Sequence, residues 1–440
     1  MKLYRSFILF LLCLSPFAAK AQDSAVVWTL QECLDYALDN NIQLNQSRIS
    51  YLSGQEDVLL AKAQLFPSLS GTVSQNYTNY PSSNAESNHH SYSGNYGLNA
   101  NWTVFNGNRR RINIQQQELQ NEVQELNVEQ NEYDILLNLV QSYMQILYAY
   151  EAIRITENTV EVSQSERDRA IELMNAGSLS RVEVAQLESQ YSSDKYQLVV
   201  AQTNLANYKL QLKQLLELDI NQDIDVVRPE ITEEDVLSPL PDKGIIYETS
   251  LQVIPDVRSS LLALDMAELE VKRARGGYFP TISLNAAIGT GHLSGMQYNF
   301  GDQLWNRFNE GVGVTVSVPI FSNRENKTAV NKAKLAVNNS QLDVMNTQNQ
   351  LLRTVEGIYL DATSAQSQYL AALERLSAVE ESYNLTQQQF YLGMKNTVEL
   401  LTEKNNYLSA QQEVIQSKYM ALMSKELLNV YQNRPVEFTY

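Results

Sequence analysis

Two segments of the chain alternate between apolar and small or polar residues with a period of two. Apolar side chains occupy every second position from Tyr96 to Val104, and again from Val312 to Ile320. This period is typical of a β-strand with one apolar face. Strand-like segments at residues 68–80 and 281–289 precede them, so the sequence predicts β-hairpins over residues 68–105 and 281–320. The connecting loops are expected at residues 81–94 and 290–309.

Two other segments contain almost no residues that break a helix. Glycine and proline are absent from Asn108 to Ala176, and Gly357 alone interrupts the segment from Phe321 to Leu392. The sequence therefore predicts long helices over residues 108–175 and 323–392, each about 100 Å long. No compact domain has a core of that length. The narrow apolar stripe of these helices fits either a solvated coiled-coil rod or the wall of a hollow tube.

Each long helix is followed by a glycine turn. The turns lie at residues 175–178, around Gly177, and at residues 391–396, around Gly393. A glycine here is suited to the left-handed conformation that ends a helix. Return helices are expected over residues 178–218 and 396–432, because neither segment contains another glycine or a proline. The chain thus contains two long helical hairpins, each with a tight tip.

The second half of the chain repeats the first. Phe66-Pro67 in FPSLS reappears as Phe279-Pro280 in FPTIS, at the start of each predicted hairpin. A shift of 216 residues aligns Gly177 with Gly393. We therefore divide the chain into a first repeat at residues 22–218 and a second at 243–432, each with a helix before its hairpin. An acidic, proline-containing linker at 219–242 joins them, and 433–440 form a tail.

The N-terminus has the features of a secretory signal peptide. Basic Lys2 and Arg5 precede a short apolar run, and a small-x-small site ends at Ala21. A lipid anchor at Cys13 is not expected, because Leu12 and not a small residue precedes it. Without residues 1–21 the chain has 30 Lys and Arg against 50 Asp and Glu, which excludes nucleic acid as a partner. Cys33 is then the one cysteine, so no internal disulfide can form.

Export and the lack of a long apolar run favour a membrane protein that crosses the bilayer as β-strands. Strands of about ten residues with one apolar face match that expectation, whereas a half-buried hairpin in a soluble domain is the alternative. Two hairpins supply four strands, which cannot close a barrel. Open sheet edges are not viable in lipid, so several chains must share one barrel, and three chains would supply twelve strands.

The sequence contains no recognisable catalytic site. Nucleophile-elbow, zinc-protease, P-loop and dinucleotide-binding motifs are absent, and the histidines are His89, His90 and His292. His89 and His90 are adjacent in a predicted loop, a poor arrangement for one metal ion. We expect no enzymatic activity, no cofactor and no metal site.

Together the paired FPxxS segments, Phe105-Asn106-Gly107-Asn108-Arg109 and its counterpart from Phe321 to Arg324, and the two glycine tips resemble the TolC-type outer-membrane efflux channels. The resemblance covers essentially the whole chain after the leader. It implies an α+β membrane protein: a homotrimer with a twelve-stranded outer-membrane β-barrel that continues into a twelve-helix periplasmic α-barrel. It also implies contact with outer-membrane lipid, a periplasmic adaptor (membrane fusion) protein and an inner-membrane pump of the RND or ABC type.

The same resemblance places a gate at the second tip. It assigns Glu399, six residues after Gly393, to an acidic ring at the periplasmic aperture and Lys395 to links that hold the aperture closed. Glu183 is the counterpart of Glu399, whereas Thr402 stands where the best-known member has a second acid. A ring of carboxylates in a narrow wet pore favours cations. The alternative is that both glutamates simply stabilise helix N-termini.

Three further expectations complete the prediction. The adaptor should contact the tip turns, at Gly177, Val182, Gly393 and Val398, and lipid-interface aromatics should include Tyr77, Tyr96 and Trp102. The function expected is a passive outer-membrane exit duct, extending into the periplasm of a Gram-negative bacterium, for a tripartite efflux or type I secretion system. A trimeric coiled-coil surface stalk or adhesin with a β-hairpin anchor is the alternative, although its helices should run one way.

Overall fold

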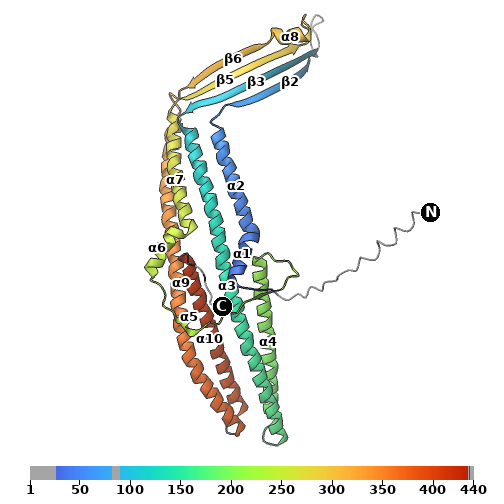
Figure 1. The fold of residues 1–440 in the computed structure, drawn as a ribbon, viewed down its shortest axis with the longest axis vertical. Helices are drawn as coiled ribbons and strands as arrows, with labels where there is room; N and C mark the ends of the chain where they lie inside the picture. The colour runs from blue at the N-terminus through green and yellow to red at the C-terminus, as the bar shows by residue number, and fades with distance from the viewer. Residues whose placement is uncertain (1–25, 82–89, 435, 437–440) are drawn as a thin grey trace, which may run out of the picture.

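The computed structural model describes residues 26–81, 90–434 and 436, and it is strongly elongated. A β-sheet occupies one end, and helices run from it to two tips at the opposite end (Figure 1). The predicted leader at residues 1–21, His89 and the last residues of the tail lie outside the described part. Among the described helices, none is both long enough and apolar enough to cross a membrane.

The sheet has four antiparallel strands in the order β2-β3-β5-β6. Its strands are β2 (Ser68–Asn79), β3 (His90–Asn106), β5 (Thr281–Leu293) and β6 (Asn309–Ser317). The strands of each predicted hairpin pair with each other, and β3 pairs with β5 to join the two hairpins. Strands β2 and β6 are the sheet edges.

The two loops differ from the prediction. Strand β3 begins at His90, so this histidine lies on a strand and not in a loop. In the second hairpin, β5 extends to Leu293 and the helix α8 (Phe300–Asn306) occupies part of the predicted loop. Strand β6 ends at Ser317, before Pro319, because proline has no N–H to continue the ladder. The strands of the two hairpins thus span residues 68–106 and 281–317, beside the predicted 68–105 and 281–320.

The strand register separates an apolar from a polar face of the sheet. Leu284 of β5 lies opposite Trp102 of β3 and opposite Val314 of β6. The neighbouring row, through Asn285, contains Asn101 and Gly313. A β-bulge between Thr103 and Phe105 shifts the parity of β3. Phe105 is thereby paired with Ile282 and remains on the apolar face.

The two helical hairpins match in length at the shift of 216 residues. The long helices are α3 (Arg109–Asn175) and α9 (Glu325–Tyr391), with 67 residues each, and the return helices are α4 (Arg181–Leu215) and α10 (Thr397–Tyr431), with 35 each. Helix α4 packs on α3, and α10 packs on α9 and also on α3. The halves nearer the sheet are covered by α2 (Ile42–Ala63) and α7 (Pro255–Arg275).

The helix expected before each hairpin is divided into two helices. Helix α1 (Leu30–Asn40) is separated from α2 by Asn41, which caps α2 through its side chain. Helix α6 (Lys243–Val253) is separated from α7 by Ile254. Pro255 follows directly and is the first residue of α7, a position where its missing N–H has no cost.

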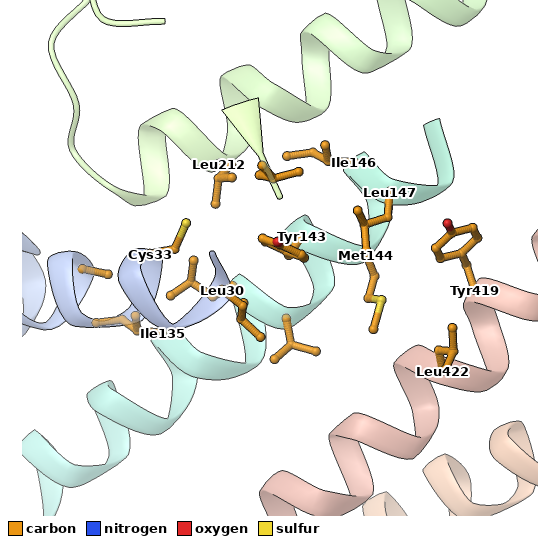
Figure 2. Packing of buried hydrophobic residues seen from close by; sticks show 14 of the residues in the cluster. Leu30, Cys33, Ile135, Tyr143, Met144, Ile146, Leu147, Leu212, Tyr419 and Leu422 are labelled. Atoms are coloured by element: carbon orange, nitrogen blue, oxygen red, sulfur yellow. The ribbon is translucent and has the colours of Figure 1, made fainter. Parts of the chain in front are cut away.

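The main hydrophobic core lies at mid-length, where α1, α3, α4 and α10 converge (Figure 2). Its centre includes Tyr143 and Leu139 of α3 and Leu212 of α4, which are fully buried. A parallel strand pair adjoins it, formed by β1 (Val26–Trp28) and β4 (Ile224–Val226). The acidic linker also contains helix α5 (Glu233–Leu237), so it is folded onto this core and is not a simple connector.

Candidate functional site at the helix tips

Both tips are built by the same helix-ending motif. At the first tip the N–H of Ser178 donates to the carbonyl of Leu173 at 2.9 Å, and the N–H of Gly177 donates to that of Met174 at 2.9 Å. At the second tip Met394 and Gly393 make the corresponding bonds. These are the two bonds of a Schellman motif, which places its glycine in the left-handed region. Gly177 and Gly393 have φ of 79° and 71°.

A capping box then starts each return helix. Ser180 caps α4, and its N–H and Oγ both donate to Glu183 Oε2, at 2.9 and 2.8 Å. Asn396 caps α10, and its N–H donates to Glu399 Oε2 at 3.1 Å. The two glutamates are therefore the third residues of their helices and satisfy N–H groups that would otherwise be unpaired. The local contacts of Glu183 and Glu399 are therefore those expected from the alternative interpretation, in which each glutamate stabilises the N-terminus of its helix.

Glu399 has a second partner that Glu183 lacks among the described residues. Lys395 Nζ lies 2.6 Å from Glu399 Oε1, and both side chains are about two-fifths exposed, at 37 % and 41 %. This ammonium, together with the Asn396 N–H, lowers the pKa of Glu399 below its ordinary value. Thr402 donates to the Val398 carbonyl at 2.8 Å within its own helix.

The sequence-predicted gate residues thus come together only in part. Lys395 and Glu399 pair with each other on one tip, and in the described part of the chain no hydrogen bond or ion pair joins them to Glu183. Val182 and Val398 are exposed at 68 % and 58 %, so each tip presents an apolar side chain to solvent.

Sequence reasoning missed a buried charge network that lies closer to mid-length and joins the two helical hairpins. Lys404 of α10 reaches α3, where its Nζ lies 2.8 Å from Glu166 Oε2 and 2.6 Å from Ser163 Oγ. Asp194 of α4 lies 3.6 Å from the same ammonium and accepts a hydrogen bond from Ser163. Side-chain exposure is 3 % for Lys404, 1 % for Glu166 and 6 % for Asp194.

Further hydrogen bonds satisfy both carboxylates. Tyr383 of α9 donates to Glu166 Oε1 at 2.8 Å, and Gln387 donates to the same oxygen at 3.3 Å. Gln190 donates to Asp194 Oδ1 at 2.8 Å. Burial, followed by the charge of Glu166, raises the pKa of the Tyr383 hydroxyl, which therefore stays protonated as a donor. The network carries one positive and two negative charges and connects all four helices of the two hairpins.

An apolar cluster lies between this network and the tips. It contains Val184 and Leu187 of the first hairpin and Phe390 and Leu400 of the second, all buried. The two tips are therefore held together by apolar packing near their ends and by the buried charge network behind it. Separation of the two helical hairpins would expose both to water.

The remaining predicted residues lie at the sheet. The N–H groups of Phe66 and Phe279 donate to Ala63 and Gly276, at 3.0 and 3.1 Å, and close the turn that leads into each hairpin. Pro67 and Pro280 follow, and proline without an N–H prevents further helix. Phe66 and Phe279 are exposed at 73 % and 56 %.

The predicted interface aromatics differ in their surroundings. Tyr77 is 65 % exposed, whereas Trp102 is 38 % exposed and donates through Nε1 to the Leu65 carbonyl at 2.7 Å. Tyr96 is half-buried and stacks against His292, which is buried between Tyr96 and Phe300. Within the described residues, no group of three or more His, Cys, Asp or Glu side chains is placed to hold a metal ion.

A family model, curated relatives and solved structures each match most of the chain. The family model described as outer membrane efflux protein matches residues 33–217 and 246–430. The outer membrane efflux protein BepC of Brucella suis is 21 % identical over 92 % of this chain and 86 % of that protein. The proteases secretion protein PrtF of Dickeya chrysanthemi is 22 % identical over 91 % and 87 %. A crystal structure of CusC superimposes with a TM-score of 0.79 at 19 % identity, and covers 93 % of each chain.

Proposed function

Because the chain belongs to the outer membrane efflux protein family, we propose that three copies form a passive exit duct in the outer membrane of a Gram-negative bacterium. The observation that carries the trimer is the four-stranded sheet with free edges at β2 and β6. Edges exposed to lipid leave backbone groups unpaired, and sharing a barrel among chains removes them. Three sheets supply twelve strands.

The two faces of the sheet support a water-filled lumen. One face contains Val, Leu, Ile and aromatic residues, and the other contains Ser, Thr, Asn and Gly along the same strands. In such a barrel the apolar face contacts lipid and the polar face lines the lumen. Helices α3 and α9 continue from β3 and β6 and would form the periplasmic wall (Figure 1).

We assign the gate to the tip region. When the two helical hairpins are packed together, as in this structure, the buried charge network and the apolar cluster hold the first helical hairpin (α3 and α4) against the second (α9 and α10). Glu399 and Glu183 would face the aperture and favour cations, with Lys395 and Thr402 beside Glu399. Opening requires the two hairpins to separate, which hydrates Lys404 and its carboxylates.

Two further partners are proposed. The exposed tip turns, with Val182 and Val398, offer apolar contacts to a periplasmic adaptor protein. An inner-membrane pump of the RND or ABC type would deliver the substrate, since relatives include proteins named for efflux and for protease secretion. The coiled-coil stalk is disfavoured because α4 and α10 return along α3 and α9, which a one-way stalk does not need.

The test is native mass spectrometry of the detergent-extracted protein, followed by planar-bilayer conductance. Three chains per particle and a conducting pore are expected. A stable monomer, or a trimer without conductance, would contradict the exit duct. Glu399→Gln in the same trimer should lower cation selectivity if the aperture assignment holds.

A further inference from the structure

Exposed basic residues gather where the helices meet the sheet. The chain has a formal charge of −17, yet its segments 105–117, 271–280 and 318–334 contain a single acid, Glu325. We call six residues of these segments the basic collar. They belong to α3, to α7 and to the start of α9, and all but the half-buried Arg110 are exposed: Arg109, Arg110, Arg111, Arg275, Arg324 and Lys327.

Backbone contacts place these three helix ends side by side. Gly107, which precedes α3, packs so closely on Gly276 after α7 that a Cβ would collide with the Gly276 carbonyl. Asn326 of α9 donates through Nδ2 to the carbonyl of Gly277 at 2.9 Å. Figure 1 shows the ends of α3, α7 and α9 meeting beneath the strands. The collar is therefore one surface and not a pattern in the sequence alone.

Ion pairs within the chain do not explain why these basic residues lie together. Among the described residues, no carboxylate lies within ion-pair distance of Arg111, Arg275, Arg324 or Lys327, whereas the neighbouring Arg273 is paired with Glu270 at 2.6 Å. Arg109 Nε donates to the carbonyl of Asn106 at 3.0 Å, which leaves other guanidinium N–H groups available.

Stabilisation of the helices does not explain the basic collar either. Five collar residues lie at the starts of α3 and α9, where the helix dipole favours acids and disfavours bases. The first turn of α3 contains no acidic residue, and neither Asn108 nor Arg324 forms a side-chain cap. The three consecutive charges of Arg109, Arg110 and Arg111 repel one another unless an external anion lies nearby.

Directly beside the collar lies a belt of exposed apolar side chains. Ile320 and Phe321, which lie just before Arg324 in the chain, are 94 % and 85 % exposed, and Phe66 and Phe279, which lie just before β2 and β5, are exposed as well. Basic residues next to an apolar belt are the arrangement expected at the boundary between lipid tails and headgroups. The position of the collar on the helix side of this belt indicates the periplasmic leaflet.

We propose that the basic collar binds the phosphate groups of anionic phospholipids in the periplasmic leaflet of the outer membrane. Arginine is suited to this role because its planar guanidinium can donate two parallel hydrogen bonds to one phosphate. The collar would fix the depth of the barrel in the bilayer and the position of the helices beneath it. This inference rests on the proposed outer-membrane duct.

The experiment uses the intact protein exchanged into mixed micelles with equal amounts of phosphatidylglycerol and phosphatidylcholine. Native mass spectrometry measures which lipid remains bound. The wild type should retain phosphatidylglycerol in preference, and Arg111→Gln, Arg275→Gln, Arg324→Gln and Lys327→Gln in one chain should reduce that preference by at least about tenfold. The control removes the same amount of charge from four exposed basic residues in the half of the molecule away from the sheet: Arg154→Gln, Arg169→Gln, Arg181→Gln and Lys195→Gln.

The outcomes are distinct. Loss of the preference in the collar variant, with the control like the wild type, supports the proposal. Equal retention of the two lipids by the wild type, an unchanged preference in the collar variant, or an equal loss in the control overturns it. Conductance of the same wild-type preparation distinguishes failure of the collar proposal from failure of the exit-duct proposal. If the pore conducts while the lipid preference is absent, the exit duct stands and the collar proposal fails.

Discussion

Removal of the Lys404 ammonium should release the two helical hairpins from each other. In the packed arrangement Lys404 is the cation that compensates Glu166 and Asp194, at 2.8 and 3.6 Å. In Lys404→Met the two carboxylates would remain buried without a counter-charge. Loss of one partner from a buried ion pair costs about 3–5 kcal/mol. Once the hairpins separate, water hydrates both carboxylates and the cost disappears.

This cost applies only while the two helical hairpins are packed together, so it shifts the equilibrium toward separated hairpins. A cost of about 3–5 kcal/mol corresponds to a factor of about 10² to 10⁴ in the equilibrium constant. We expect single channels of Lys404→Met in planar bilayers to spend a much larger fraction of time in a high-conductance state. Cells that produce the variant should also become more sensitive than wild-type cells to large antibiotics.

A neutral variant separates the effect of charge from that of shape. In the triple variant Lys404→Met, Glu166→Gln and Asp194→Asn, no charge is left uncompensated, and a neutral replacement of a buried ionic group is often tolerated. Its open fraction should return toward the wild type. If Lys404→Met conducts like the wild type, or if the triple variant is as open as the single one, the buried charge does not hold the hairpins together.

Three further predictions concern single side chains. Gly107→Ala should abolish assembly because its Cβ would meet the Gly276 carbonyl, whereas Gly177→Ala, with a similar positive φ but open space, should cost only about 1–2 kcal/mol in the free energy of unfolding. Trimer yield and denaturant midpoints check this pair. Glu399→Gln should keep the capping box but lose the pairing with Lys395, and Glu399→Ala should lose both and have a lower denaturant midpoint. Since the pKa of Glu399 is lowered, the contribution of its ion pair to stability is fully present above pH 4.5, its ordinary pKa, and is lost as the pH falls through the lowered value. The difference in denaturant midpoint between the wild type and Glu399→Gln should therefore vanish in acid. Burial raises the pKa of the Cys33 thiol to about 12, so maleimide should label Cys33 at neutral pH only after denaturation.

The sequence predicted the fold class because its signals are local and repeated. Period-two alternation, glycine-free segments and a glycine at each tip each specify backbone geometry directly. The predicted long helix at 108–175 and α3 (Arg109–Asn175) differ by one residue. Strand β1, strand β4 and helix α8 were missed because short elements take their structure from the core or sheet on which they pack.

The candidate site was harder to predict because it depends on contacts between distant segments. Positions that the two repeats share indicate Glu183 and Glu399, which both form capping boxes. Lys404 was missed because its counterpart at the shift of 216 is Glu188, of opposite charge. Gly107 and Gly276 were missed for a related reason, since their close approach joins residues that are 169 positions apart.

This difference between the repeats has a mechanical consequence. The network joins the first hairpin of a chain to its own second hairpin, through Glu166 and Asp194 on one side and Lys404 on the other. In the proposed ring, contacts within chains alternate with contacts between chains. A contact between chains would use the duplicate positions, where Ser382 and Ala410 replace the two acids and Glu188 replaces the lysine. No buried ion pair can form from those residues. The charge network therefore joins the two hairpins within each chain and not across the boundaries between chains, so the proposed opening, in which the two hairpins of a chain separate, requires each chain to break its own network.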